Sequence, residues 1–310
     1  MKKYIILADM TCDLSEEIRN EIGMIDYVPG HVYMGEGKDI PGVLSWDDIS
    51  RTDFYKALSN KKSNFSTAPA NVEEYYEIFE KYVKEGYAIL SMSLSSKISS
   101  THDFASMAAN RIKENYPDSS IYCFDTFRMS GGFGLLTLYA HLLKKEGKSF
   151  EEVIAWLEDN KRKVHQMGPI DDLFFVARRG RLTMGKAVMG SFAGVKPMGD
   201  CNADGYTTVI TKVKGIGKAL DVTVSYMKET AVDVENSYVI VAHSDRELYA
   251  ETLKKKIEEE VKPKKVFFTD VFPGCGVNIG PGMVGVFYLG NEISQDLSYE
   301  KEIMNRITGK

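Results

Sequence analysis

The sequence predicts an α/β protein built from two α/β domains, with a parallel sheet in the first domain and a mixed sheet in the second. Along the first half, short apolar runs alternate with amphipathic helical stretches, a pattern typical of a parallel sheet covered by helices. The second half contains a hairpin pattern and then another strand, helix and strand. We expect the domains to cover residues 1–165 and 166–310 and to pack closely around a cleft.

Three apolar runs of the first half are expected to be buried strands, at residues 4–8, 88–94 and 121–124. Polar loops follow these runs, and ligands of open α/β sheets bind beyond the carboxyl ends of the strands. Helix starts are marked by capping boxes, in which a Ser or Asn and an acidic residue three positions later satisfy free backbone N–H groups. Four such pairs occur, namely Ser45 with Asp48, Asn71 with Glu74, Ser100 with Asp103, and Ser149 with Glu152.

The second half begins with an expected hairpin over residues 195–213, because Asp204-Gly205 is a turn signal before a run rich in Thr, Val and Ile. A strand, helix and strand unit and a last strand complete the chain. They are expected at residues 238–242, 245–261, 265–272 and 285–289.

Composition and charge exclude several classes of protein. The 310 residues are 44% hydrophobic and 27% charged, as in ordinary globular chains, and the net charge of −5 offers no basic field for nucleic acid. Apolar runs are far shorter than the ~20 residues of a membrane helix, and no signal peptide is recognisable, so we expect a cytoplasmic protein. The dispersed cysteines are expected to be free thiols without a structural zinc or another metal. They are Cys12, Cys123, Cys201 and Cys275.

The most informative segment is the hydroxyl-rich stretch over residues 91–101, which lies between an expected strand and an expected helix. Ser and Thr donors beside a helix N-terminus favour a bound carboxylate or phosphate, because free N–H groups and the helix dipole attract negative charge. Its candidate ligand-binding side chains are Ser95, Ser96, Ser99, Ser100 and Thr101. The alternative is that these residues only cap the helix and turn the chain.

Two further segments could contribute to the same site. Ser66 and Thr67 precede Pro69, which keeps the residue before it extended, although they could equally be an incidental entry to the next helix. Residues 274–285 (GCGVNIGPGMVG) supply Asn278 as a neutral donor between glycines that allow close approach of a ligand. The spacing differs from a dinucleotide-binding motif, and Pro281 with Gly282 favours a tight loop over a helix N-terminus.

Most enzyme signatures are missing. The sequence has no phosphate-binding P-loop, nucleophile elbow or zinc-protease motif. His243 and its neighbours are expected to cap a helix, since contiguous residues do not readily form a catalytic triad. Asp9 follows the first strand, where a phosphotransferase or hydrolase of the haloacid dehalogenase type would carry D-x-D, but position 11 is Thr. A phosphotransferase or hydrolase that uses Asp9 and a small-anion sensor that uses the serine loop remain alternatives.

The chain resembles the DegV family of fatty acid-binding proteins over nearly its whole length. Seven short motifs of that family have counterparts in the same order. They lie at residues 9–14 (DMTCDL), 66–69 (STAP), 95–101 (SSKISST), 125–134 (DTFRMSGGFG), 176–183 (VARRGRLT), 195–205 (VKPMGDCNADG) and 278–282 (NIGPG). The order of the seven motifs is what makes the resemblance specific.

The resemblance implies a carrier and not an enzyme. The acyl chain of a long-chain fatty acid would lie in an apolar tunnel between the two domains, and hydroxyl groups would hold its carboxylate. The implied ligand-binding residues are Ser66, Thr67, Ser99, Ser100, Asn278 and Gly280, with Asn278 in place of a family histidine and Ser100 in place of a glycine. The family's partner is the catalytic subunit of a fatty acid kinase, and no cofactor is implied.

A basic segment follows the middle of the chain and could dock a protein partner or make transient contact with an acidic membrane surface. It contains Arg178, Arg179, Arg181 and Lys186. The alternative is a solvated surface without a partner.

Overall fold

The first of two larger sheets is parallel and forms the core of the N-terminal part. The structure, a computed structural model, describes residues 2–35, 37–60, 63–181 and 194–310. The strand order is β1-β5-β6, so β5 lies in the centre of the sheet and pairs in parallel with β1 on one side and with β6 on the other. The strands are β1 (Tyr4–Ala8), β5 (Ala88–Ser93) and β6 (Ile121–Asp125). These bounds confirm the three strands expected from the apolar runs.

Helices cover both faces of this sheet, which explains why its strands read as continuous apolar runs. On β1, Ile5 and Leu7 pack with one pair of helices, while Ile6 and Ala8 share a cluster with the other pair. The first pair is α3 (Val72–Lys84) and α4 (Thr101–Asn115), and the second is α5 (Ser130–Lys145) and α6 (Phe150–Asn160). A short helix, α1 (Glu16–Ile22), packs beside α5.

The second large sheet is mixed and belongs to the C-terminal part, as expected. Its order is β11-β10-β12-β7, where β10 and β11 are parallel and the other two pairings are antiparallel. The strands are β7 (Val164–Met167), β10 (Tyr238–His243), β11 (Lys265–Asp270) and β12 (Val284–Leu289). The helices on its outer face are α8 (Ile216–Thr230), α9 (Glu247–Glu260) and α11 (Ser298–Thr308).

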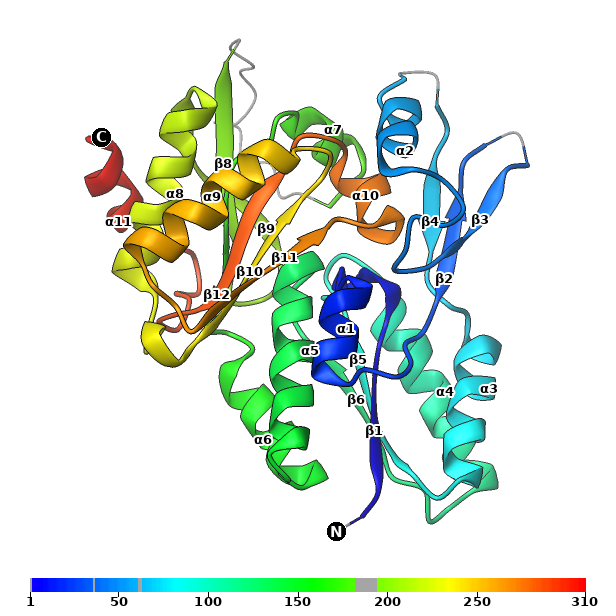
Figure 1. The fold of residues 1–310 in the computed structure, drawn as a ribbon. Coiled ribbons are helices and arrows are strands. Elements are labelled where there is room, and N and C mark those ends of the chain that lie inside the picture. Colours follow the sequence, from blue (N-terminus) through cyan, green and yellow to red (C-terminus); the bar gives the residue numbers. More distant parts are fainter. Residues whose placement is uncertain (1, 36, 61–62, 182–193) are drawn as a thin grey trace.

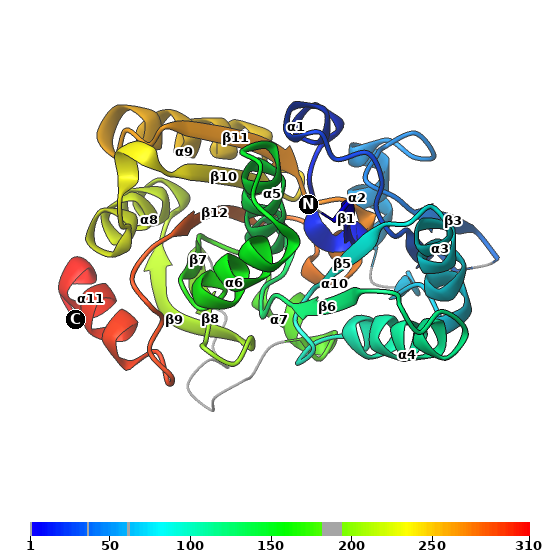
Figure 2. The same cartoon turned by 90° about the horizontal axis from the view of Figure 1, so that it is seen from below.

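Helix α5 lies between the two sheets and packs against both of them. Its side chains share one core cluster with residues of β1 and of β10, so the inner faces of both sheets are buried against the same helix. Figures 1 and 2 show α5 between the sheets, with α8 and α9 on the far side of the second one. The expected domain division between residues 165 and 166 falls within β7, and the division stays a prediction.

Smaller elements complete the walls around the junction of the sheets. An antiparallel sheet has the order β3-β2-β4, and the expected hairpin is present as β8 and β9. The strands are β2 (Gly30–Tyr33), β3 (Asp39–Gly42), β4 (Ser66–Ala68), β8 (Val195–Cys201) and β9 (Thr207–Lys214). The helices are η1 (Met10–Cys12), α2 (Arg51–Leu58), α7 (Leu173–Arg178), α10 (Pro273–Ile279) and η3 (Val234–Asn236).

Of the four predicted capping boxes, two are confirmed and two are wrong. The boxes at Asn71 and Ser149 are both complete. No helix begins at Ser45, because the next helix starts at Arg51, where Ser50 is the N-cap and accepts from the Asp53 N–H. Ser100 is the N-cap residue of α4 but makes no side-chain capping bond.

The glycine-rich segment over residues 274–285 is not a tight loop throughout. Its first half belongs to α10, which Pro273 starts at a position where a missing N–H costs nothing. The helix ends at Gly280, whose φ of +77° favours glycine. Among the described helices, none is long and apolar enough to cross a membrane.

Candidate functional site

A cavity of about 440 Å³ lies at the junction of the two sheets and takes its lining from both halves of the chain. Most of the lining is apolar. It includes Leu94, Ile98, Phe104, Ile170, Met198, Val209, Ile279 and Phe287. A cavity of this size with apolar walls and a few polar groups is typical of a small-molecule site.

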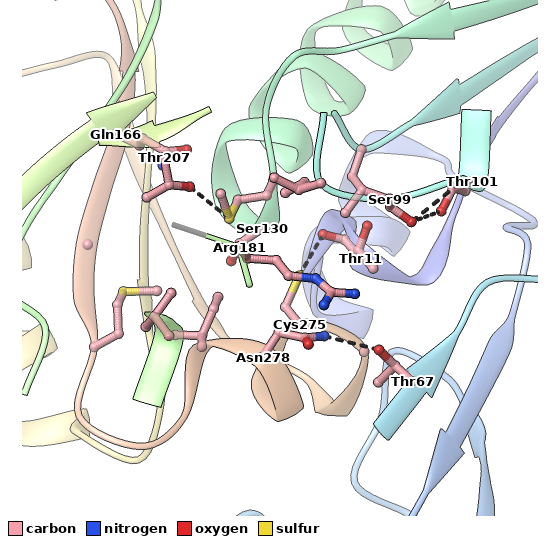
Figure 3. A pocket seen from close by; sticks show the side chains of 18 of the residues that line it. Thr11, Thr67, Ser99, Thr101, Ser130, Gln166, Arg181, Thr207, Cys275 and Asn278 are labelled. Atoms are coloured by element: carbon pink, nitrogen blue, oxygen red, sulfur yellow. Dashed lines mark hydrogen bonds between the residues drawn. The ribbon is translucent and has the colours of Figure 1, made fainter. Parts of the chain in front are cut away.

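One end of the cavity carries hydroxyl and amide groups, which we call the hydroxyl cluster: Thr11, Thr67, Ser99, Thr101 and Asn278. Ser99 Oγ lies 2.7 Å from Thr101 Oγ1 and accepts from the Thr101 N–H at 3.3 Å. Asn278 Nδ2 donates to Thr67 Oγ1 at 3.0 Å. Because Thr67 accepts this bond, its own proton remains available for a ligand in the cavity (Figure 3).

The start of α4 adds polarity to the same end. Ser100 also lines the cavity, and because this residue makes no side-chain capping bond, the first turn of α4 keeps N–H donors to offer to an anion. A helix N-terminus carries a partial positive charge, which favours a carboxylate or phosphate there.

The structure brings four of the six implied site residues together and leaves two outside. Ser99, Ser100, Thr67 and Asn278 line the cavity. Ser66 is exposed, because neighbouring residues of a strand point to opposite faces and Thr67 takes the inner position on β4. Gly280 packs against the ring of Phe175, where a Cβ at position 280 would come within 2.6 Å.

The polar lining residues that were not expected to contact a ligand include Thr11 and Arg181. Thr11 appeared only as the residue that breaks a D-x-D motif, yet it belongs to the hydroxyl cluster. Arg181 appeared only as part of the basic segment, yet its side chain extends into the cavity, as Figure 3 shows. Spacing alone gave no signal for either, since both depend on how distant loops fold together.

Arg178 and Arg179 of the basic segment do not line the cavity. Arg178 is exposed and lies 3.9 Å from Asp172, and Arg179 donates to the Phe65 carbonyl at 2.5 Å. Lys186 lies outside the described residues. The docking of a partner or membrane by this segment stays a prediction.

Asp9 lies in the cavity wall, and both of its carboxylate oxygens are engaged. Oδ1 accepts from the Thr11 N–H at 2.8 Å and from Thr11 Oγ1 at 2.5 Å, and Oδ2 accepts from the Leu94 N–H at 3.1 Å. Burial raises the pKa of Asp9 to about 6, although these hydrogen bonds act in the opposite direction. The carboxyl group therefore holds η1 and the end of β5 in place.

Asp13 is fully buried, does not line the cavity, and connects three elements through its hydrogen bonds. It has a φ of +49°, which Asp tolerates better than most residues. Its Oδ2 accepts from Ser130 Oγ of α5 at 2.6 Å, and its Oδ1 accepts from the Phe272 N–H before α10 at 2.9 Å. Burial raises the pKa of Asp13 to about 8.

Stability should fall with rising pH because of Asp13. Between about pH 4 and pH 8 the folded chain keeps a proton that the unfolded chain releases, so the free energy of unfolding decreases as pH rises. We expect Asp13→Asn to reduce this slope by up to about 1.4 kcal/mol per pH unit in chemical denaturation series. The exposed control Asp118→Asn should keep the wild-type slope. Identical slopes for all three proteins would contradict this assignment.

The cysteines are free thiols, as expected. Cys275 lines the cavity, and its Sγ donates to the Thr11 carbonyl at 3.4 Å. Burial raises the pKa of this thiol well above its ordinary value, so it is not a reactive thiolate. The described part of the chain holds no group of His, Cys, Asp and Glu side chains suited to a metal ion.

His243 contributes to the start of a helix and not to a triad. Its Nδ1 accepts from the Arg246 N–H at 3.3 Å, and its Nε2 lies 3.3 Å from Asp270 Oδ1. Ser244 Oγ accepts from the Met283 N–H at 2.8 Å. Asp245 Oδ1 lies 3.9 Å from Arg51 Nε. The three contiguous residues therefore have separate partners.

Fold and cavity together define a class: an α/β protein with two main sheets that enclose a small-molecule site with one polar end. The sequence model of a family described as "Uncharacterised protein, DegV family" matches residues 3–291. The chain belongs to the DegV family. A DegV domain-containing protein of Clostridium perfringens is 32% identical over 294 residues, covering 94% of this chain and 99% of that protein. The resemblance seen in the sequence is confirmed.

Solved structures of the family share the fold. A DegV lipid-binding protein from Thermotoga maritima has a TM-score of 0.81 at 23% identity, with 94% of this chain and 100% of that chain covered. A DegV family protein from Thermus thermophilus, described by its fatty acid binding, has a TM-score of 0.82 at 22% identity and the same coverage. The Fatty Acid Kinase B3 protein of Streptococcus pneumoniae, loaded with linoleic acid, has a TM-score of 0.78 at 17% identity, with 93% and 100% covered.

Proposed function

We propose that this protein binds a long-chain fatty acid, with the acyl chain in the apolar cavity and the carboxylate at the hydroxyl cluster. The observation that carries the proposal is the division of one cavity into a mostly apolar part and a polar end. Each buried CH₂ group contributes about 0.8 kcal/mol, so a long chain gains far more from such walls than a small anion does.

The polar end suits a carboxylate. Ser99 and Thr67 offer hydroxyl donors, and the first turn of α4 adds N–H groups and the helix dipole. Arg181 is the one lysine or arginine among the described lining residues, and it supplies a charge of the opposite sign. Neutral donors around an ionised carboxylate lower its pKa and keep it charged inside the protein.

Relatives support a role as a carrier for a kinase. The neighbours from Thermus thermophilus and Streptococcus pneumoniae are described with fatty acids, and the latter is named as part of a fatty acid kinase. We extend the proposal to presentation of the bound acid to a separate kinase subunit, which would phosphorylate its carboxylate. In this role the chain supplies the substrate and needs no catalytic base or cofactor of its own.

The alternatives have less support. A phosphotransferase or hydrolase of the haloacid dehalogenase type would carry a second Asp at position 11, but this residue is Thr, and its N–H and hydroxyl group both donate to Asp9 Oδ1. A sensor for a small anion would need only the hydroxyl cluster and would leave the apolar walls without a function.

Titration of delipidated protein tests the proposal. We expect octadecanoic acid to bind with one site per chain, octanoic acid to bind far more weakly, and acetate and inorganic phosphate not to bind measurably. In the presence of a fatty acid kinase catalytic subunit and ATP, the loaded protein should yield acyl phosphate. Tight binding of phosphate with no binding of octadecanoic acid would favour the sensor, and phosphoester hydrolysis lost in Asp9→Asn would favour the hydrolase.

A further inference from the structure

The cavity wall has a second polar region, on the opposite side from the hydroxyl cluster. Gln166 of β7 and Thr207 of β9 line the wall that belongs to the C-terminal part. Figure 3 shows them on the opposite side of the cavity from Ser99, Thr101 and Thr67. A fatty acid whose carboxylate lies at the hydroxyl cluster would bring the later part of its chain to this wall.

The amide of Gln166 is incompletely paired. Its backbone N–H donates to Asp200 Oδ1 at 3.0 Å, which fixes the main chain. Its side-chain Oε1 is buried, and no described residue donates a hydrogen bond to it. An acceptor in such a position loses its water without gaining a partner, which is unfavourable unless a ligand supplies a donor.

The side-chain oxygen of Gln166 lies beside α5. Gly132 on α5 faces it, and a Cβ built there would lie 3.4 Å from Oε1. The terminal torsion of a glutamine has a broad minimum, so the oxygen can rotate toward the cavity at little cost. Thr207 Oγ1, 3.9 Å from Met129 Sδ, adds a second polar group on the same wall.

The partner of Gln166 should be neutral. The described lining contains only two charged side chains, Asp9 and Arg181, and neither comes from the elements that carry Gln166 and Thr207. A second carboxylate on the ligand would find no cation there, and its desolvation would not be offset. A hydroxyl group donates one hydrogen bond and also accepts, so it matches a carboxamide.

We infer that the preferred ligand is a hydroxy fatty acid, with a hydroxyl group in the later half of the chain that donates to Gln166 Oε1. This inference rests on the proposed function, because it needs the carboxylate at the hydroxyl cluster. One hydrogen bond of ordinary strength corresponds to a preference of up to about tenfold over the unsubstituted acid.

The test compares 10-hydroxy- and 12-hydroxyoctadecanoic acid with octadecanoic acid on delipidated protein. We expect at least one hydroxy acid to bind about tenfold more tightly than octadecanoic acid. In Gln166→Leu, which replaces the amide with an apolar group of similar size, the ratio of affinities should fall to about one. Ser99→Ala should weaken all the acids together and keep the wild-type ratio. Gln166→Met provides a second variant if the first does not fold.

The outcomes separate this inference from the proposed function. Equal affinities for all three acids in the wild-type protein would overturn the inference and leave fatty acid binding intact. A preference that persists in both Gln166 variants would also overturn it, since another group would then hold the hydroxyl. No binding of any of the acids would contradict the proposed function itself.

Discussion

The double variant Thr67→Val, Ser99→Ala should bind octadecanoic acid about a hundredfold or more less tightly than the wild-type protein. Each substitution removes a hydroxyl donor at the polar end, and a hydrogen bond to a charged group contributes about 1.5–3 kcal/mol. Since about 1.4 kcal/mol corresponds to a factor of ten, two such bonds account for a hundredfold loss. Titration of delipidated protein measures the loss directly.

A matched control separates this effect from general destabilisation. Ser59 and Thr252 are exposed hydroxyl residues away from the cavity, and their side chains bond only to the carbonyl of their own helix. The double variant Ser59→Ala, Thr252→Val should therefore keep wild-type affinity. If both double variants bound octadecanoic acid as the wild type does, the carboxylate would not lie at the hydroxyl cluster.

Gly134→Ala should strongly destabilise the fold. Gly134 lies in the second turn of α5, where a Cβ would come within 2.4 Å of the Cys12 carbonyl oxygen and 2.9 Å of Leu14 Cδ2. The backbone oxygen cannot move aside as a flexible side chain would, so α5 must shift away from η1. We expect a loss of about 3 kcal/mol or more in the free energy of unfolding, measured by chemical denaturation.

Gly217→Ala is the matched control for this prediction. Gly217 lies in the first turn of α8, and a Cβ there would meet no atom within 4 Å. Alanine favours helix over glycine by about 1 kcal/mol, so the control should be neutral or slightly stabilising. Equal stability of both variants would contradict the close packing of α5 against η1.

The strands of the two larger sheets were predictable because strands that are buried on both faces appear in the sequence as continuous apolar runs. Residues 4–8 form an apolar run in the sequence and all five are buried in β1. The β8 and β9 hairpin was predictable for a different reason, since its Asp204-Gly205 turn is a local signal and Gly205 has a φ of +90°. Both signals are contained in a few neighbouring residues.

Other elements depend on distant contacts and escaped prediction. The helix α10 is rich in glycine, which is a poor helix former. Glycine is needed there because the helix packs closely against Tyr55 and Phe54. A Cβ on Gly276 would lie 2.7 Å from the Tyr55 hydroxyl oxygen. The sequence suggested a loop because it shows the low propensity and not the crowded surroundings. Strand β4 has only three residues, too few for a recognisable alternation.

Some residues of the candidate site were likewise predictable from their neighbours in the sequence, and others depended on distant contacts. The serine loop before α4 was predictable, because hydroxyl residues and a helix start are neighbours in the sequence. The choice between Ser66 and Thr67 needed the strand orientation, and the entry of Arg181 into the cavity needed the full fold. Gln166 gave no signal at all, since its lack of a partner is a property of the folded wall.

Mass spectrometry of the purified protein, in native form and then after solvent extraction, tests the central claim most directly. We expect a co-purified long-chain fatty acid at close to one molecule per chain, and the extracted protein should take up added octadecanoic acid at the same ratio. A protein that carries no lipid and takes up none would contradict the claim that its cavity is a fatty acid site.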